Sequence, residues 1–425
     1  MSGEPSGFRT YEIYQRERVG ESTAKIQPRQ LSSAQYLTDP YSLLTILRDN
    51  YPCYRDWPGN AFWLTHYDDV TSVFVDDANF ETRPKRWFYG LADHGRDLRD
   101  ELPVLTQRAR SYDELAEKVA NELVDRFVDR GEVDLAVALA ARYPLELLVR
   151  ALALPADEVP LFIERYVRMQ RGWLWEPNAQ RSGWAAIEEL TAYFGPLLDA
   201  RRDDPGDDLV SVIGALDLAG GPATAGDVVV TLLEEDHETL HGALANLWCL
   251  LLDDPVQLDH VRSDRRMVKH AYLEALRHST PVLAARRFAR HEVERFGRLL
   301  PEGALLICSA AAANRDRRVF ADPDQFIVGR KDLCQREPRG MYRADGLPAG
   351  IAFGLGKPSK FPALPEDRPR SRYAITRDVA SIATNVLLDR LPGVRLATGA
   401  EPTLRSLRLG EMHTCWRLPV VFDAA

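Results

Sequence analysis

Apolar residues recur with helical spacing over much of the chain. Between residues 112 and 130, Leu115, Val119, Leu123 and Phe127 occupy every fourth position and share one helix face. The longest helical pattern covers 227–252, about 39 Å at about 1.5 Å per residue, which is long enough to cross a domain. These patterns predict a protein built mainly from helices.

The pattern changes after a further predicted helix at 265–278. Residues 293–310, VERFGRLLPEGALLICSA, predict a strand, a turn at Pro301–Gly303 and a second strand. Residues 331–372 are rich in Pro, Gly, Arg and Lys and predict an irregular segment, followed by a helix over 373–390 and short strands. The predicted fold class is therefore mainly α with a small segregated β-sheet.

Composition limits which binding partners and which cellular compartment we expect for the protein. The chain has 425 residues, 45% of them hydrophobic, and a formal net charge of -9. The negative charge argues against nucleic acid or an anionic membrane as the main partner. No apolar run is long enough for a transmembrane helix, and the N-terminus has no apolar signal core, so we expect a cytoplasmic protein. Five scattered cysteines without a CxxC pair predict neither a zinc site nor a disulfide framework.

Four ordered segments carry a resemblance to a known family. They are TLLEEDHETLHGALANLWCLLLDDP at 231–255, the pair Glu274 and Arg277 in ExxR spacing, ANRDRRVFADPDQF at 313–326, and FGLG at 353–356. In this order they resemble the bacterial cytochromes P450. The resemblance extends over about 36–425.

The resemblance implies one cytochrome P450 fold domain over 36–425, preceded by a polar lead-in at 1–35. It implies a role in small-molecule biosynthesis, of specialised metabolites in particular, with a small-molecule substrate and with a protein partner in the pathway as an option. Glu274 and Arg277 lie three residues apart and can pair on one helix face, and the resemblance gives them a structural role. The family often has Arg where this chain has Gln325, which affects a third contact of that pair.

The segment that matches the family's heme-binding loop departs from it. The family's loop reads FxxGxRxCxG, and counting from Phe353 through Gly356 puts Pro358 at the Arg/His position and Lys360 at the cysteine position. No cysteine lies between residues 334 and 415. A thiolate donates electron density to heme iron, whereas a protonated lysine has no lone pair to donate.

We therefore expect no thiolate-ligated heme and, as the favoured interpretation, no cofactor. Heme with atypical ligation is the alternative. In that case Lys360, neutral only if burial lowers its pKa strongly, would stand at the ligand position with Phe353 and Gly356 in the loop. Arg287, or Arg286 beside it, would be a propionate anchor. His94, Arg96 and Arg99 lie where the family has HxxxR, but their spacing differs.

The central helix also departs from the family. Glu235 and Asp236 replace the usual Ala-Gly pair, whereas His237, Glu238 and Thr239 follow the family pattern. Two carboxylates against a heme face would be costly to desolvate. We predict that Glu238, Thr239, Glu235 and Asp236 form a catalytic cluster, with Glu238 as acid or base and Thr239 as a hydroxyl relay.

Two further interpretations remain. Glu234 and His237 have the i, i+3 spacing of carboxylate-bridged metal helices, but no second helix offers ligands, so no metal is expected.

For the function of the protein there are two hypotheses. In the first, the protein is a P450-type enzyme without normal thiolate-heme chemistry, which works either by heme-free acid–base catalysis or as an oxidoreductase with atypical heme ligation. In the second, it is a non-catalytic helper. Cysteine-less members of the family that activate glycosyltransferases make the helper role an alternative that the resemblance permits.

Overall fold

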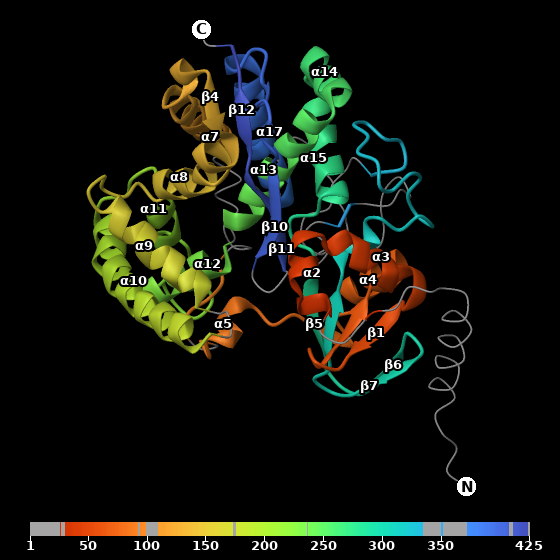
Figure 1. Cartoon of the computed structure of the whole chain (residues 1–425). Helices are drawn as coiled ribbons and strands as arrows, with labels where there is room; N and C mark the ends of the chain where they lie inside the picture. Colours follow the sequence, from red (N-terminus) through yellow and green to blue (C-terminus); the bar gives the residue numbers. More distant parts are fainter. Residues whose placement is uncertain are drawn as a thin grey trace.

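A computed structural model gives the fold of the chain. It describes residues 26, 30–91, 94–98, 109–172, 176–235, 237–334, 350–351, 372–407 and 411–423. Figure 1 shows a lobe that contains the largest sheet, a lobe of helices, and further helices between and above them.

The largest sheet joins two distant parts of the chain. Its strand order is β1 (Cys53–Asp56), β2 (Ala61–Leu64), β8 (Leu305–Cys308), β5 (Ala285–Ala289) and β3 (Phe80–Glu81). β2 and β8 pair in parallel, and the other neighbours are antiparallel. The short helices α2 (Ala34–Thr38), α3 (Pro40–Asn50), α4 (Tyr67–Phe74) and α16 (Ala310–Ala313) lie by this sheet (Figure 1).

Three smaller sheets stand apart from it. They are β10 (Thr403–Leu407) with β11 (Met412–Arg417), β4 (Glu132–Asp134) with β12 (Pro419–Val421) and β9 (Arg395–Leu396), and β6 (Val293–Arg295) with β7 (Arg298–Leu300). Phe296 and Gly297 both have positive φ, which closes a tight turn between β6 and β7. The predicted pair of strands at 293–310 is thus three strands, because the chain turns once more than expected.

Most of the helices divide between two hydrophobic clusters, whereas α2 and α3 contribute to a third one beside the large sheet. The first cluster includes residues of α7 (Ala109–Asp125), the π-helical turn Ala136–Ala140, α8 (Arg142–Ala151), α13 (His237–Asp253), α14 (Pro255–Ser263), α15 (Met267–His278) and α17 (Arg372–Arg390). The second includes residues of α8, α9 (Val159–Arg171), α10 (Pro177–Asp203), α11 (Leu209–Gly214) and α12 (Ala225–Glu234). The predicted helices at 112–130, 265–278 and 373–390 correspond to α7, α15 and α17, whereas most of 331–372 lies outside the described residues.

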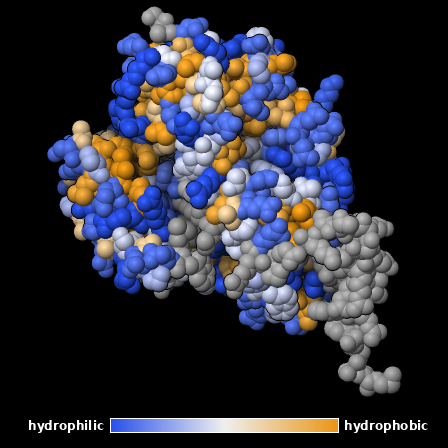
Figure 2. Space-filling view, viewed as in Figure 1, coloured by the Kyte–Doolittle hydropathy of each residue, from blue (hydrophilic) through white to orange (hydrophobic). Residues whose placement is uncertain are grey.

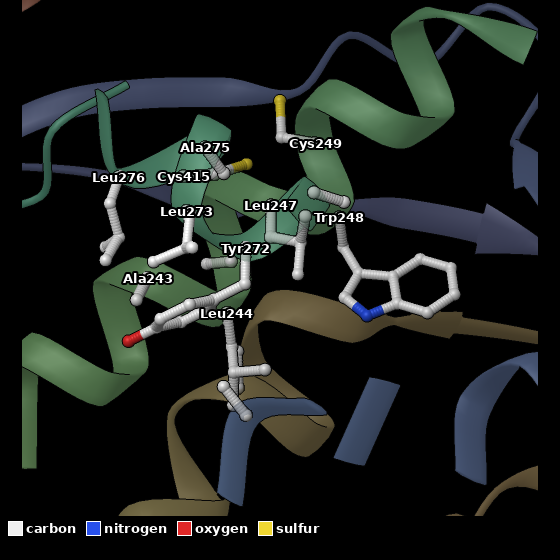
Figure 3. Packing of buried hydrophobic residues seen from close by; sticks show 14 of the residues in the cluster. Ala243, Leu244, Leu247, Trp248, Cys249, Tyr272, Leu273, Ala275, Leu276 and Cys415 are labelled. Atoms are coloured by element: carbon white, nitrogen blue, oxygen red, sulfur yellow. The ribbon is translucent and has the colours of Figure 1, made fainter. Parts of the chain in front are cut away.

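The central helix is interrupted, contrary to the single helix predicted over 227–252. α12 ends at Glu234, Glu235 takes an extended conformation with φ -70° and ψ 140°, and α13 begins at His237. α12 belongs to the second hydrophobic cluster and α13 to the first, so the interruption falls between the two. Figure 3 shows α13 packed through Leu244 and Leu247 against α15 residues such as Tyr272.

The fold class is confirmed as mainly α with small, separate sheets. No helix in the described part of the chain is long and apolar enough to span a membrane. On the face in Figure 2, hydrophobic side chains form scattered patches separated by hydrophilic ones.

Candidate functional site

The Glu274–Arg277 pair lies fully buried on α15. The Arg277 guanidinium donates from Nε and NH2 to the two carboxylate oxygens of Glu274, each at 2.8 Å. Its remaining N–H groups reach the backbone oxygens of Asn314, Pro323 and Gln325 at 2.7–2.9 Å. The pair therefore fixes the chain segment 314–325 against α15.

A third ionic partner of this pair comes from Arg330. Its NH1 lies 3.2 Å from Glu274 Oε1, and its Nε lies 2.6 Å from Asp332 Oδ1. Gln325 contributes only its backbone carbonyl, so the missing arginine at 325 does not remove the third cation. Arg330 was not predicted from the sequence, because its spacing from the ExxR pair differs from the position that the resemblance suggested.

Asn314 connects this network to the segment that precedes the heme-loop match. Its Nδ2 donates to Ile351 O at 2.6 Å, and its Oδ1 accepts from Ile351 N at 2.7 Å. Phe353, Gly356, Pro358 and Lys360 lie outside the described residues. The network therefore fixes Ile351, the last described residue before the heme-loop match.

α12 is anchored at its start by Arg96. The Arg96 guanidinium contacts the Asp227 carboxylate at 2.7 and 3.0 Å and donates to backbone carbonyls of the preceding loop. Burial alone would raise the pKa of Asp227, but the hydrogen bonds from Arg96 and Thr224 lower it to about 2. Arg96, considered above as part of a propionate site, therefore serves as a support of the helix.

The end of α12 is held by side chains from two other elements. Gln170 of α9 donates from Nε2 to the backbone oxygens of Leu232, Leu233 and Glu235 at 2.8–3.1 Å. The last carbonyls of a helix have no partner within it, and here the amide supplies one. Gln170 Oε1 in turn accepts from Lys85 Nζ at 2.8 Å.

Glu234 completes this arrangement. Its carboxylate is buried and accepts from the backbone N–H groups of Lys85 and Arg86 at 3.2 and 2.9 Å, at the start of α5 (Lys85–Phe88). Lys85 Nζ also lies 3.4 Å from Glu235 O. We call Lys85, Gln170 and Glu234 the central brace, because they hold α5 and α9 to the end of α12.

The predicted catalytic residues lie around the helix interruption. Glu235 is half-buried, and its carbonyl belongs to the contacts of the central brace. Asp236 lies outside the described residues. Glu238 and Thr239 are half-buried in the first turn of α13. Because the helix is interrupted at Glu235, this residue does not continue the 100° spacing of Glu238 and Thr239 on α13.

The metal-helix spacing of Glu234 and His237 does not lead to a ligand set. The Glu234 carboxylate accepts from the two amides of α5, and His237 Nδ1 lies 3.2 Å from the Tyr166 hydroxyl. Within the described residues, no three His, Cys, Asp or Glu side chains are grouped as metal ligands.

The two neighbouring arginines of β5 point to opposite faces of the sheet. Arg287 is half-buried, lies over the Phe74 ring of α4 at 4.7 Å and donates to the backbone oxygen of Arg286 at 2.8 Å. Burial lowers the pKa of its guanidinium. Arg286 instead pairs with Glu411. The predicted anchor Arg287 thus faces α4, and its neighbour faces the β10–β11 turn.

At least two of the five cysteines are unsuited to serve as a thiolate ligand for heme. All five cysteines are buried in the first hydrophobic cluster, and burial raises the pKa of Cys53 and of Cys308 to about 12. Such thiols stay protonated at neutral pH, whereas the thiolate is the metal ligand.

The comparisons with known proteins give a consistent family. No protein-family model matches the chain. A putative cytochrome P450 133B1 of Xylella fastidiosa (strain 9a5c) is 28% identical over 401 residues, 86% of this chain and 92% of that protein. The pulcherriminic acid synthase of Bacillus subtilis (strain 168) is 24% identical over 86% of this chain and 91% of that protein. The mycinamicin IV hydroxylase/epoxidase of Micromonospora griseorubida is 29% identical over 82% and 87%.

Solved structures show the same fold. The ligand-free structure of cytochrome P450 TbtJ1 matches with a TM-score of 0.74 at 22% identity, over 92% of this chain and all of that one. P450BioI, in complex with an acyl carrier protein that carries hexadec-9Z-enoic acid, matches with a TM-score of 0.73 at 20% identity over 92% and 100%.

These comparisons overturn the prediction that the chain has no cofactor. The relatives and the solved structures are cytochromes P450, which are heme proteins, so heme is the cofactor to which the comparisons point. The prediction was wrong because it inferred loss of the whole group from loss of one ligand.

Proposed function

Because the chain belongs to the cytochrome P450 superfamily, we propose that it acts on a small, largely apolar molecule in the biosynthesis of a specialised metabolite. The relatives support this substrate class. They include enzymes named for pulcherriminic acid, cyclomarin C and mycinamicin IV, and a structural match is a P450 of a polyketide synthase.

The observation that carries the proposal is the position of Glu238 and Thr239. Both lie in the first turn of α13, directly after the helix interruption, and both are half-buried. The N-terminal end of a helix favours a negative charge, so Glu238 is suited to remain a carboxylate that accepts a proton. The Thr239 hydroxyl can both donate and accept, which suits a relay. Glu235 and Asp236 are proposed to complete this cluster.

The proposed chemistry differs from that of a thiolate-ligated P450. Lys360, at the position of the lost cysteine, remains the proposed heme-side residue, together with Phe353, Gly356 and Arg287. Heme would supply redox chemistry when bound, whereas the residues of α13 would orient the substrate and move a proton at the Glu238 carboxylate.

The test is product formation in the producing strain. Glu238→Gln and Thr239→Ala should each reduce product about 100-fold or more, because general acid–base groups contribute about 100- to 10,000-fold. Glu188→Gln, an exposed glutamate on α10, is the matched control. Equal product from Glu238→Gln and the control, at equal melting temperatures, contradicts the proposal.

A second candidate is a helper that activates a partner enzyme such as a glycosyltransferase. The central brace favours it, because Glu234 and the Glu235 carbonyl, which belong to the acidic run, have structural roles. A helper predicts that deletion of the chain abolishes product, whereas Glu238→Gln leaves product and co-purification with the partner unchanged.

A further inference from the structure

A groove lies on the surface of the helical lobe between α9 and α10, which lie side by side (Figure 1). The two helices are antiparallel, since Tyr193 contacts Glu158 just before α9 and Glu189 contacts Arg165 further along it. The groove has a volume of about 180 Å³ and is lined by Glu158, Leu161, Phe162, Arg165, Leu190 and Tyr193. Small-molecule sites usually have about 300–1,000 Å³, so the groove suits a single side chain better than a whole ligand.

The floor of the groove is apolar and preformed. Phe162 and Leu190 are 2% and 0% exposed and belong to the second hydrophobic cluster. The Phe162 ring stacks on Tyr166 with centroids 5.9 Å apart and meets Phe194 edge to face at 6.2 Å. Leu161 differs from them, because it is 50% exposed on the wall of the groove. A single exposed leucine is ordinary, but one beside a preformed apolar groove extends the surface that a partner side chain would contact.

The carboxylate of Glu158 lies at one end of the groove. Its Oε2 accepts from the Tyr193 hydroxyl at 2.5 Å, and its other oxygen has no hydrogen-bond partner among the described residues. Asp157 beside it is exposed, and neither carboxylate forms an ion pair within the part of the chain that the structure describes. This end of the groove is therefore negative.

The charges at the other end of the groove are balanced. Arg165 Nε and Arg168 NH2 both donate to Glu189 Oε2 at 2.8 Å. Arg168 also pairs with Glu164 at 2.7 Å, so two guanidiniums meet two carboxylates. The complementary partner of the groove is therefore an apolar side chain with a cation at one side of it. A third helix can present both, because residues three or four apart lie on one face, and the groove between two helices accepts such a ridge.

We propose that this groove docks an amphipathic helix of a partner protein, which inserts one large apolar side chain over Phe162 and Leu190 and places a Lys or Arg at Glu158. The inference goes beyond the proposed function, because none of the groove residues belongs to the cluster on α13. α9 carries Gln170 near its other end, so a partner in the groove contacts the same helix that holds the end of α12.

The test measures binding of two labelled helical peptides to the full chain by fluorescence anisotropy. Each peptide is about 18 residues long, because shorter isolated helices are marginal, and has a central Leu among Ala and Gln residues. One peptide has Lys a turn away from the Leu, and the other has Glu there. The Lys peptide should bind at least about tenfold more tightly, because the Glu peptide places like charges together at Glu158. Glu158→Lys should reverse this preference, whereas Glu188→Lys, at an exposed glutamate of α10 outside the groove, should keep it.

Leu161→Ser should weaken binding of the Lys peptide at least about tenfold, as expected for an apolar contact at the centre of an interface. The matched control Val256→Ser, at an apolar residue of α14 that is 73% exposed, should leave binding unchanged. Equal binding of the two peptides, no binding of either, or an unchanged preference in Glu158→Lys overturns the proposal. If sedimentation equilibrium shows a dimer that Leu161→Ser dissociates, the groove docks a second copy of the chain, and the proposal of a partner helix is overturned.

Discussion

Two buried glutamates, Glu274 and Glu234, are stabilised in different ways. Glu274 faces two guanidiniums, those of Arg277 and Arg330, so its charge is balanced by other charges. Glu234 accepts hydrogen bonds from the backbone N–H groups of Lys85 and Arg86, and the Lys85 ammonium is bonded to Gln170 of the same brace. The first arrangement connects segments of one half of the chain, whereas the second connects segments that lie between 62 and 150 residues apart.

The two glutamates hold different parts of the structure in place. The Glu274 network holds the segment 314–330 and Ile351 against α15, a static support next to the heme-loop match. The central brace holds α5 and α9 to a helix end, where the backbone already departs from helical geometry. We therefore expect loss of Glu274 to destabilise the whole domain and loss of Glu234 to release mainly α5.

The largest expected effect is that of Glu274→Ala. It leaves Arg277 buried without its carboxylate, whereas Arg330 keeps Asp332, and removing one partner of a buried ion pair costs about 3–5 kcal/mol. Urea unfolding should show this loss in the free energy of unfolding, with the exposed Glu294→Ala as control. If the free energy of unfolding of Glu274→Ala were unchanged, Glu274 would not stabilise the whole domain, and the proposed difference from Glu234 would be wrong.

Acid should destabilise the region just after the helix interruption. His241 of α13 is 6% exposed, and burial lowers its pKa to about 4, compared with about 6.5 in the unfolded chain. Between pH 6.5 and 4 the unfolded state binds more protons, so the free energy of unfolding falls as pH falls and levels off below about 4. His241 accounts for a loss of about 3 kcal/mol in the free energy of unfolding over this range.

His241→Phe keeps an aromatic ring against Trp416, which His241 meets edge to face at 5.1 Å. Unfolding at pH 7 and pH 4.5 should show a smaller loss of stability in this variant than in the unmodified chain. An identical loss in both would mean that His241 does not titrate on unfolding in this range.

Gln170→Leu tests whether the central brace is independent of the Glu274 network. It removes the amide that serves three carbonyls and the acceptor of Lys85, at a cost of about 1–3 kcal/mol for buried groups left unpaired. Hydrogen exchange should become faster in α5 and around Glu235, whereas α15 stays protected. If exchange in α15 became faster to the same degree, the central brace and the Glu274 network would open together and would not be independent.

The smallest effect is expected for Glu234→Gln. The amide retains one acceptor oxygen, so one of the two hydrogen bonds to α5 is lost, about 1 kcal/mol. Limited proteolysis should cleave near residues 85–88 sooner than in the control Glu188→Gln. No change in cleavage would indicate that α5 is held by its other contacts.

The sequence predicted the elements whose cause is local. α7 and α15 carry their own periodic apolar faces, and Glu274 and Arg277 are close enough in the chain to pair on one helix face. The interruption at Glu235 was not predictable in the same way. Residues 227–252 read as one continuous helix, and the side chains that hold its end, Gln170 and Lys85, are distant in sequence.

The face of the sheet on which each β5 arginine lies is set by the strand register. Arg286 and Arg287 are adjacent and chemically identical, so only the pairing of β5 with β8 decides which one faces Glu411. The resemblance offered both residues, and register cannot be read from two neighbouring arginines.

The parallel pairing of β2 with β8 has a consequence for how the protein forms. β1 and β2 leave the ribosome early, but their neighbour β8 starts only at Leu305, so the central hydrogen bonds of the large sheet must wait for most of the chain. Pairings between such distant segments are slow to form and leave strand edges exposed in the meantime. Chains that stop before Leu305 should therefore aggregate through β2, and synthesis of the full protein should depend on chaperones more than its helical content suggests.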